Sequence, residues 1–165
     1  MSEALVIGVG NPWRGDDGAG PAVARLLAGT PGIQVAECGG EATQLMQCWA
    51  GFKRVFLVDS VVTGNAPGVI LRLTVDQPLP STSRHSSHGL GLAEAVELAR
   101  ALGELPPGLV IYGIEPQSLN DGAGLSPVVA TAVETVARAI GEELNICRRG
   151  AETQRTEMNR QDCTD

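Results

Sequence analysis

Two aspartates and a histidine stand where predicted strands of this chain give way to loops. Asp17 follows an apolar run at residues 4–7 and a Gly-rich turn. Asp59 closes the apolar run 55–58, and His88 comes just before a predicted helix. In an open α/β sheet, ligands bind outside the carboxyl ends of the strands. Two carboxylates and an imidazole suit zinc, nickel or copper, and three protein ligands leave coordination positions open for a substrate. The pattern predicts a metal-recognising enzyme.

The two acidic positions also have ordinary structural interpretations. One of Asp16 and Asp17 can cap the helix that follows, because a carboxylate there accepts hydrogen bonds from free backbone N–H groups and suits the helix dipole. A pair is more than a cap requires, and the glycines on either side of it leave room for another molecule to approach. Asp59 can equally cap or turn residues 60–62. The local sequence leaves these interpretations open beside the metal hypothesis.

The two histidines, His85 and His88, lie three residues apart in a serine-rich segment. A single histidine is most often an ordinary polar residue. His88 has the better position, beside Gly89 at the start of a predicted helix, and is the histidine that we expect at the metal. The adjacent serines do not make a catalytic triad, because adjacency in sequence is no evidence of triad geometry.

The Gly8-x-Gly10 turn after the first predicted strand is similar to the start of a dinucleotide-binding motif. The third glycine of that motif is missing at Trp13. Asp16 and Asp17 would also put negative charge at the helix N-terminus, where a pyrophosphate binds. A nucleotide is therefore disfavoured, and the G-x-S-x-G, H-E-x-x-H and Walker A patterns of other enzyme classes do not occur.

Cys38 lies near the end of the second predicted strand. It is a poor candidate nucleophile, because the neighbouring acids Glu37 and Glu41 would raise the pKa of a thiol. The four cysteines show no C-x-x-C spacing, so we expect free thiols in the reducing cytoplasm.

The bulk composition narrows the class of protein. At 165 residues the chain is about one domain, large enough to bury a core of its own. Its net charge of −7, from 12 basic and 19 acidic residues, disfavours a nucleic-acid partner. We see no signal peptide and no apolar stretch of membrane-spanning length, so we expect a cytoplasmic protein with no membrane partner.

Short apolar runs alternate with helical patterns, which is typical of an α/β fold. Strands are predicted at residues 4–9, 33–37, 54–59, 69–75 and 109–114, and helices at 19–28, 42–50, 90–102 and 127–144. The gap between 59 and 69 is too short for a helical crossover, so those two strands are predicted to be antiparallel neighbours or nearly so. Residues 77–88 are predicted to form a long functional loop. The domain is predicted to span residues 1–146, with a polar, disordered tail at 147–165.

Several segments together resemble the maturation endopeptidases of nickel–iron hydrogenases. The matching motifs are Ile7-Gly8-Val9-Gly10-Asn11 with Asp16-Asp17-Gly18-Ala19-Gly20, Leu57-Val58-Asp59 with Pro67-Gly68, Ser86-Ser87-His88-Gly89-Leu90-Gly91-Leu92, and Tyr112-Gly113-Ile114-Glu115-Pro116 with Leu125-Ser126-Pro127. They follow one another in order from residue 5 to about residue 140, and the tail is not included. The Cys38-Gly39-Gly40-Glu41 stretch departs from the Asp-Gly-Gly-Thr that is commoner in the family, which puts substrate choice in doubt more than activity.

The resemblance implies a three-layer α/β sandwich, with a mostly parallel, twisted, five-stranded sheet and helices on both faces. It implies an endopeptidase that removes the C-terminal extension of a nickel–iron hydrogenase large-subunit precursor after nickel insertion. By resemblance, Asp17, Asp59 and His88 are the metal-contacting and catalytic residues. They would complete the coordination of nickel that the substrate already holds, so no permanently bound cofactor is expected. Asp17 or Asp59 would accept the proton in catalysis.

Two alternatives use the same residues differently. The first is a nickel-binding maturation chaperone that holds the metal and cuts nothing. The second is a small cytoplasmic hydrolase with a resident zinc ion, which would copurify with about one zinc per chain.

Overall fold

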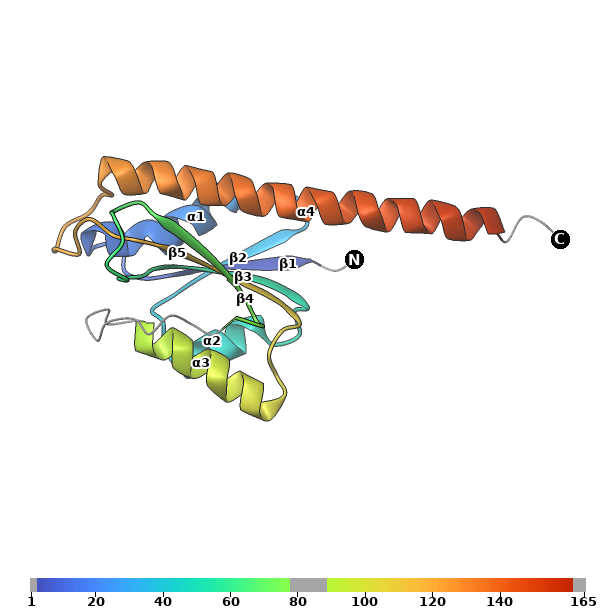
Figure 1. Cartoon of the computed structure of the whole chain (residues 1–165), viewed down its shortest axis with the longest axis horizontal. Helices are drawn as coiled ribbons and strands as arrows, with labels where there is room; N and C mark the ends of the chain where they lie inside the picture. The colour runs from blue at the N-terminus through green and yellow to red at the C-terminus, as the bar shows by residue number, and fades with distance from the viewer. Residues whose placement is uncertain (1–2, 78–88, 162–165) are drawn as a thin grey trace.

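A five-stranded sheet forms the middle layer of the molecule, and helices cover both of its faces (Figure 1). The computed structural model describes residues 3–77 and 89–161. The strands are β1 (Ala4–Val9), β2 (Ile33–Cys38), β3 (Arg54–Ser60), β4 (Ile70–Thr74) and β5 (Gly108–Ile114). The helices are the 3₁₀ turn η1 (Gly15–Gly18), α1 (Ala19–Leu27), α2 (Ala42–Trp49), α3 (Gly89–Leu102) and α4 (Pro127–Gln161). The predicted three-layer α/β fold is confirmed, and η1 is an element that the sequence patterns did not predict.

The strand order β2-β1-β3-β5-β4 places a topological switch point at the centre of the sheet. The chain leaves β1 through α1 to β2 on one side, and then crosses through α2 to β3 on the other side of β1. β1, β2, β3 and β5 run parallel to one another. In open α/β sheets, ligands bind in the crevice outside the carboxyl ends of the strands at such a point. That crevice lies between the ends of β1 and β3.

The third and fourth strands are antiparallel, as predicted, but they are not direct neighbours. β4 pairs antiparallel with β5 at the edge of the sheet, and β5 lies between β3 and β4. The reason is burial. Six of the seven residues of β5 are buried, so this strand requires partners on both sides, whereas β4 is half-exposed and carries Arg72 toward solvent.

Two apolar cores hold the layers together. One lies between the sheet and the pair α1 and α4, and it contains Phe56 and Val58 of β3. The other lies between the sheet and the pair α2 and α3, and it contains Val55 and Leu57. Because side chains alternate along a strand, Asp59 follows Leu57 onto the face that α2 and α3 cover.

Close backbone contact sets the position of α1. A Cβ atom at Gly20 would lie 2.3 Å from the carbonyl oxygen of Val58 and 2.4 Å from that of Val9. A Cβ atom at Gly8 would lie 2.4 Å from the carbonyl oxygen of Gly20. Only glycine fits at these points, so α1 begins directly on the ends of β1 and β3. The residues just before α1 are therefore carried to the switch point.

The prediction that the last helix ends at residue 144 is wrong, because α4 continues to Gln161. Its last part runs past the end of the sheet (Figure 1). Residues 145–161 contain Gln, Glu, Arg and Ala, which favour helix, and no proline that would stop it. The division of the chain into a domain at 1–146 and a tail at 147–165 stays a prediction. None of the helices in the described residues has the length and apolar character that would let it cross a membrane.

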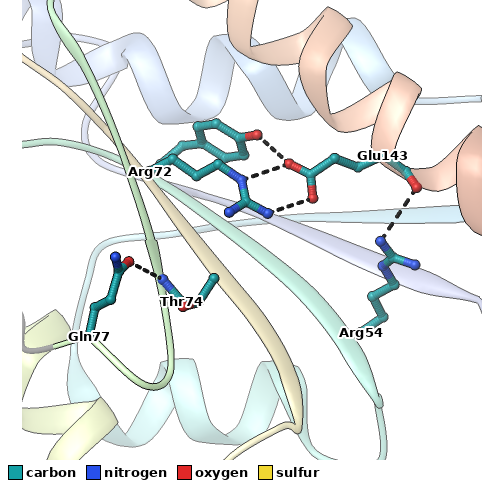
Figure 2. Close-up of polar contacts among 6 residues, drawn as sticks. Arg54, Arg72, Thr74, Gln77 and Glu143 are labelled. Atoms are coloured by element: carbon teal, nitrogen blue, oxygen red, sulfur yellow. Dashed lines mark hydrogen bonds and ion pairs between the residues drawn. The ribbon is translucent and has the colours of Figure 1, made fainter.

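A polar network connects α4 to strands β3, β4 and β5 (Figure 2). The guanidinium of Arg72 donates to both carboxylate oxygens of Glu143, at 2.9 and 3.0 Å. The hydroxyl of Tyr112 donates to the same carboxylate at 2.5 Å, and Arg54 donates to the Glu143 carbonyl oxygen. Burial, with the neighbouring Glu143 charge, raises the pKa of Tyr112 to about 12. Tyr112 therefore stays a hydrogen-bond donor at neutral pH.

Candidate functional site

Asp59 is a buried carboxyl group with no hydrogen-bond partner among the described residues. It is the penultimate residue of β3, at the switch point, and its exposure is 0%. Neither of its carboxylate oxygens receives a hydrogen bond from the described part of the chain. It therefore does not cap or turn the residues after β3. Burying an unpaired carboxylate is costly, so the charged form of Asp59 is disfavoured unless a second group compensates it.

The pKa of Asp59 lies well above its ordinary value. Burial is the largest cause, and the negative charge of Asp17 is the second. The backbone N–H of Ser60 lies near enough to lower the pKa partly, without reaching hydrogen-bond geometry. The charges of the two carboxyl groups therefore interact across the switch point.

Asp17 comes to this point through η1 rather than as the cap of a helix. It is almost fully buried, and its side chain accepts a hydrogen bond from the backbone N–H of Asn11 at 2.9 Å. A Cβ atom at Gly10 would lie 1.9 Å from the Asp17 carbonyl oxygen, and Gly10 has φ +138°. Gly10 is thus required by the chain's own packing, which explains this glycine without a bound phosphate.

Asp16 has a structural task that its sequence position did not reveal. Its carboxylate accepts hydrogen bonds from the backbone N–H groups of Gln117, Ser118 and Ser126 and from the Ser126 hydroxyl. Burial raises the pKa of Asp16, but these hydrogen bonds outweigh it and the pKa lies below its ordinary value. Neither Asp16 nor Asp17 caps a helix through its side chain. Asp16 instead fixes η1 to the segment between β5 and α4.

Glu115 makes a second such clamp on the opposite side of β5. This buried residue follows β5, and its carboxylate accepts hydrogen bonds from the backbone N–H groups of Thr63 and Gly64 and from the Thr63 hydroxyl. The segment that leaves Asp59 is therefore held in place. In the sequence, Glu115 and Ser126 stand out only as parts of the motifs that match the family. The sign of such a role is a polar residue at the boundary of an element. Glu115 directly follows β5, and Ser126 directly precedes α4.

Cys38 ends β2 on the same face of the sheet as Asp59. Its thiol is buried in the core beside α2 and α3. Burial is the main cause that raises its pKa, and the charge of Asp59 adds to it. This agrees with the expectation that Cys38 is a poor nucleophile.

His88 and His85 lie outside the described residues. The chain is described again from Gly89, at the start of α3. A Cβ atom at Gly91 would lie 2.0 Å from the carbonyl oxygen of Gly40, just past β2, so α3 begins at the carboxyl edge of the sheet. The described residues alone contain no set of three metal-ligating side chains. They supply the carboxylate pair of Asp17 and Asp59.

This arrangement has two chemical uses. A buried carboxyl group with a raised pKa, such as Asp59, can accept and return a proton. Buried carboxylate oxygens without partners can also contact a cation, which would remove the electrostatic cost of their burial. Both uses belong to hydrolytic sites that handle a metal.

The sequence and the overall fold of this chain have counterparts in known proteins. Residues 22–143 match the family model described as hydrogenase maturation protease. The chain belongs to the hydrogenase maturation protease family. It is 31% identical over 137 residues to the hydrogenase 2 maturation protease of Escherichia coli, an alignment that covers 79% of this chain and 83% of that protein.

Solved structures of hydrogenase maturation proteases have the same architecture. The hydrogenase maturating endopeptidase HybD from E. coli superposes with a TM-score of 0.77 at 28% identity, covering 88% of this chain and 93% of HybD. The [NiFe] hydrogenase maturation protease HybD from Thermococcus kodakarensis gives 0.70 at 28% identity, covering 86% and 98%. The match therefore extends over nearly the whole of each relative and confirms the resemblance inferred from the motifs.

Proposed function

We propose that this chain is a cytoplasmic endopeptidase that removes the C-terminal extension of a nickel–iron hydrogenase large-subunit precursor after nickel has been inserted. Membership of the hydrogenase maturation protease family supports the hydrolase and its substrate class. The single observation that carries the recognition of a metal is Asp59, a fully buried carboxyl whose oxygens have no partner in the described residues and which interacts with the charge of Asp17.

Nickel enters this proposal as part of the substrate. The proposed contacts are the carboxylates of Asp17 and Asp59 and the imidazole of His88, a mixed oxygen and nitrogen set that suits nickel. A cation between two buried carboxylates offsets both their repulsion and their loss of water. A precursor that carries nickel is therefore bound more tightly than one without it, and it is cleaved only after nickel insertion.

The carboxylates also supply the proton chemistry of peptide hydrolysis. A water molecule attacks the scissile carbonyl, and Asp17 or Asp59 accepts its proton. The proton then passes to the leaving amine. The raised pKa of Asp59 makes its carboxylate a stronger base than an ordinary aspartate when it is ionised. The metal held by the substrate would polarise the carbonyl oxygen.

The first experiment compares a cognate large-subunit precursor with and without nickel, after incubation with the protein. Intact mass spectrometry is expected to show loss of one C-terminal peptide only in the nickel-loaded sample. An unchanged mass in both samples, with a precursor verified as cognate and nickel-bound, would favour the non-proteolytic nickel chaperone. About one zinc per purified chain would instead favour the resident-zinc hydrolase.

The site residues are tested one by one in the same assay. Asp17→Asn, Asp59→Asn and His88→Gln are each expected to reduce the processing rate by at least a hundredfold, because each removes a metal contact or the base. His85→Gln is the matched control and is expected to process normally. Full processing by any of the three variants would remove that residue from the site.

A further inference from the structure

A groove on the face formed by α1 lies beside the loop that carries Asp17. It encloses about 300 Å³. One wall consists of Pro12 and Trp13 from the loop after β1, another of Ala22 and Arg25 from α1, and the floor comes from residues 123–125 before α4. Its lining is mainly apolar, so this groove suits an apolar side chain.

Trp13 stands at the rim and is 70% exposed, the largest exposure among the bulky apolar side chains of the described residues. Its loop is nevertheless well anchored. The backbone N–H of Trp13 donates to the side chain of Asn11 at 2.9 Å, and its carbonyl oxygen accepts from the N–H of Gly122 at 2.8 Å. The N–H of Gly15 donates to the carbonyl oxygen of Gly122 at 2.8 Å. An exposed indole on an anchored loop loses little conformational entropy on binding.

The α1 wall continues the apolar surface. Leu26 follows Ala22 by four residues, so it lies on the same face of the helix, and it is 57% exposed. Arg25 is held back at the edge by a two-pronged ion pair with Glu37, at 2.7 and 2.9 Å. An exposed aromatic anchor, an apolar groove and a paired polar rim are the usual parts of a protein–protein contact.

The groove is continuous with the proposed cleavage site. Gly18 lines it and directly follows Asp17 in the chain. Asn11 donates its backbone N–H to Asp17 and accepts the Trp13 N–H with its side chain, so one residue joins the carboxylate to the rim. The groove therefore adjoins Asp17, one of the proposed substrate contacts.

We propose that this groove, with Trp13 as its anchor, binds an apolar side chain of the hydrogenase large-subunit precursor and so positions the precursor for cleavage. The inference rests on the proposed function, because the occupant is that enzyme's substrate. A peptide substrate requires contacts beyond a metal ion, and the groove is an apolar surface that adjoins Asp17. The groove thus supplies affinity and register, while the carboxylates supply chemistry.

The test measures cleavage kinetics on purified, nickel-loaded precursor. Trp13→Ala is expected to raise KM at least tenfold and to change kcat less than twofold, because the indole contacts substrate away from the scissile bond. Ala22→Gln, which fills the groove from the helix side, is expected to act in the same direction. The matched control is Leu102→Ala, an exposed leucine at the end of α3, which is expected to leave both constants unchanged.

The outcomes separate this inference from the proposed function. If both groove variants have a normal KM and the wild type cleaves normally, the groove does not bind substrate. The proposed protease function is then unaffected. If the wild type does not cleave, calorimetric titration with the same precursor tests independently whether the groove binds it. Binding weakened tenfold by Trp13→Ala supports it, and equal binding overturns it. A dimer of the wild type that Trp13→Ala converts to a monomer overturns it too, since the groove would then bind a second copy of this chain.

Discussion

Replacement of Asp59 by asparagine keeps the size of the side chain and removes its ability to carry charge. In the wild type this carboxyl is completely buried and its oxygens have no hydrogen-bond partner in the described residues. An unsatisfied buried polar group costs about 1–3 kcal/mol, and more when it is charged. The asparagine amide is also polar and cannot ionise, so this substitution removes only the additional cost of burying a charge. We therefore expect Asp59→Asn to raise the free energy of unfolding at pH 8 by about 1–3 kcal/mol, or the melting temperature by about 3–9 °C for a chain of this size.

The pH dependence gives this prediction a signature. The pKa of Asp59 in the folded protein lies well above the ordinary value of 3.8, chiefly because of burial. Between the ordinary and the raised pKa, the unfolded chain has released a proton that the folded protein retains. The contribution of Asp59 to the free energy of unfolding is fully present when the pH is below its ordinary pKa. This contribution is lost as the pH rises through the raised pKa of the folded protein. The advantage of Asp59→Asn should therefore be smallest at pH 4 and grow toward pH 8.

The assay is thermal unfolding of both proteins at a series of pH values from 4 to 9, with the difference between them plotted against pH. Subtraction removes the contributions of other groups, such as Asp16. Asp76→Asn, at an exposed aspartate, is the matched control and should show no difference at any pH. A variant less stable than the wild type at pH 8, or a difference independent of pH, would refute the reasoning, because it would mean that Asp59 has a stabilising partner in the native protein.

Two further perturbations test the parts that position the site. Asp16→Asn is expected to lower the free energy of unfolding by about 2–3 kcal/mol at pH 7, because charge-assisted hydrogen bonds to three backbone N–H groups weaken. Since the folded pKa of Asp16 is depressed, this loss should shrink as the pH falls through that pKa, which urea unfolding at several pH values will show. Gly20→Ala should cost about 3 kcal/mol, because its Cβ would lie 2.3 Å from a backbone oxygen of β3. Gly141→Ala, in α4 with no atom within 4 Å of its Cβ, should instead stabilise by about 0.5–1 kcal/mol in the same melts. Equal effects of the two glycine substitutions would contradict the close contact of α1 with the sheet.

The order and type of the main elements could be predicted from sequence, because each has a local pattern. Apolar runs bounded by glycine or proline mark the strands, and β1 spans Ala4–Val9 as predicted. The place of β4 could not be predicted from the length of its connection alone. It depended on β5, which is far along the chain and is buried on both faces. Which strand takes a central position depends on how much apolar surface each strand buries in the folded chain. This cannot be inferred from any single local segment.

The candidate site divides in the same way. Asp17 and Asp59 could be found from sequence, since a carboxylate after a buried strand reaches the ligand-binding edge of an α/β sheet. Sequence could not separate the tasks of the adjacent Asp16 and Asp17. Only tertiary structure brings Ser118 and Ser126 to the carboxylate of Asp16, across more than a hundred residues, and makes it a clamp.

Residue types and their spacing by themselves determined the fold class, the edge of the sheet that carries the site, and the family resemblance that the comparisons confirmed. Tertiary structure decided the electrostatic state of the site. The pKa of Asp59 is high because the folded chain excludes water from it, brings the charge of Asp17 near, and places no hydrogen-bond donor from the described residues on its oxygens. Desolvation and through-space charge depend on the positions of atoms from distant segments, so they exist only once those segments have packed together.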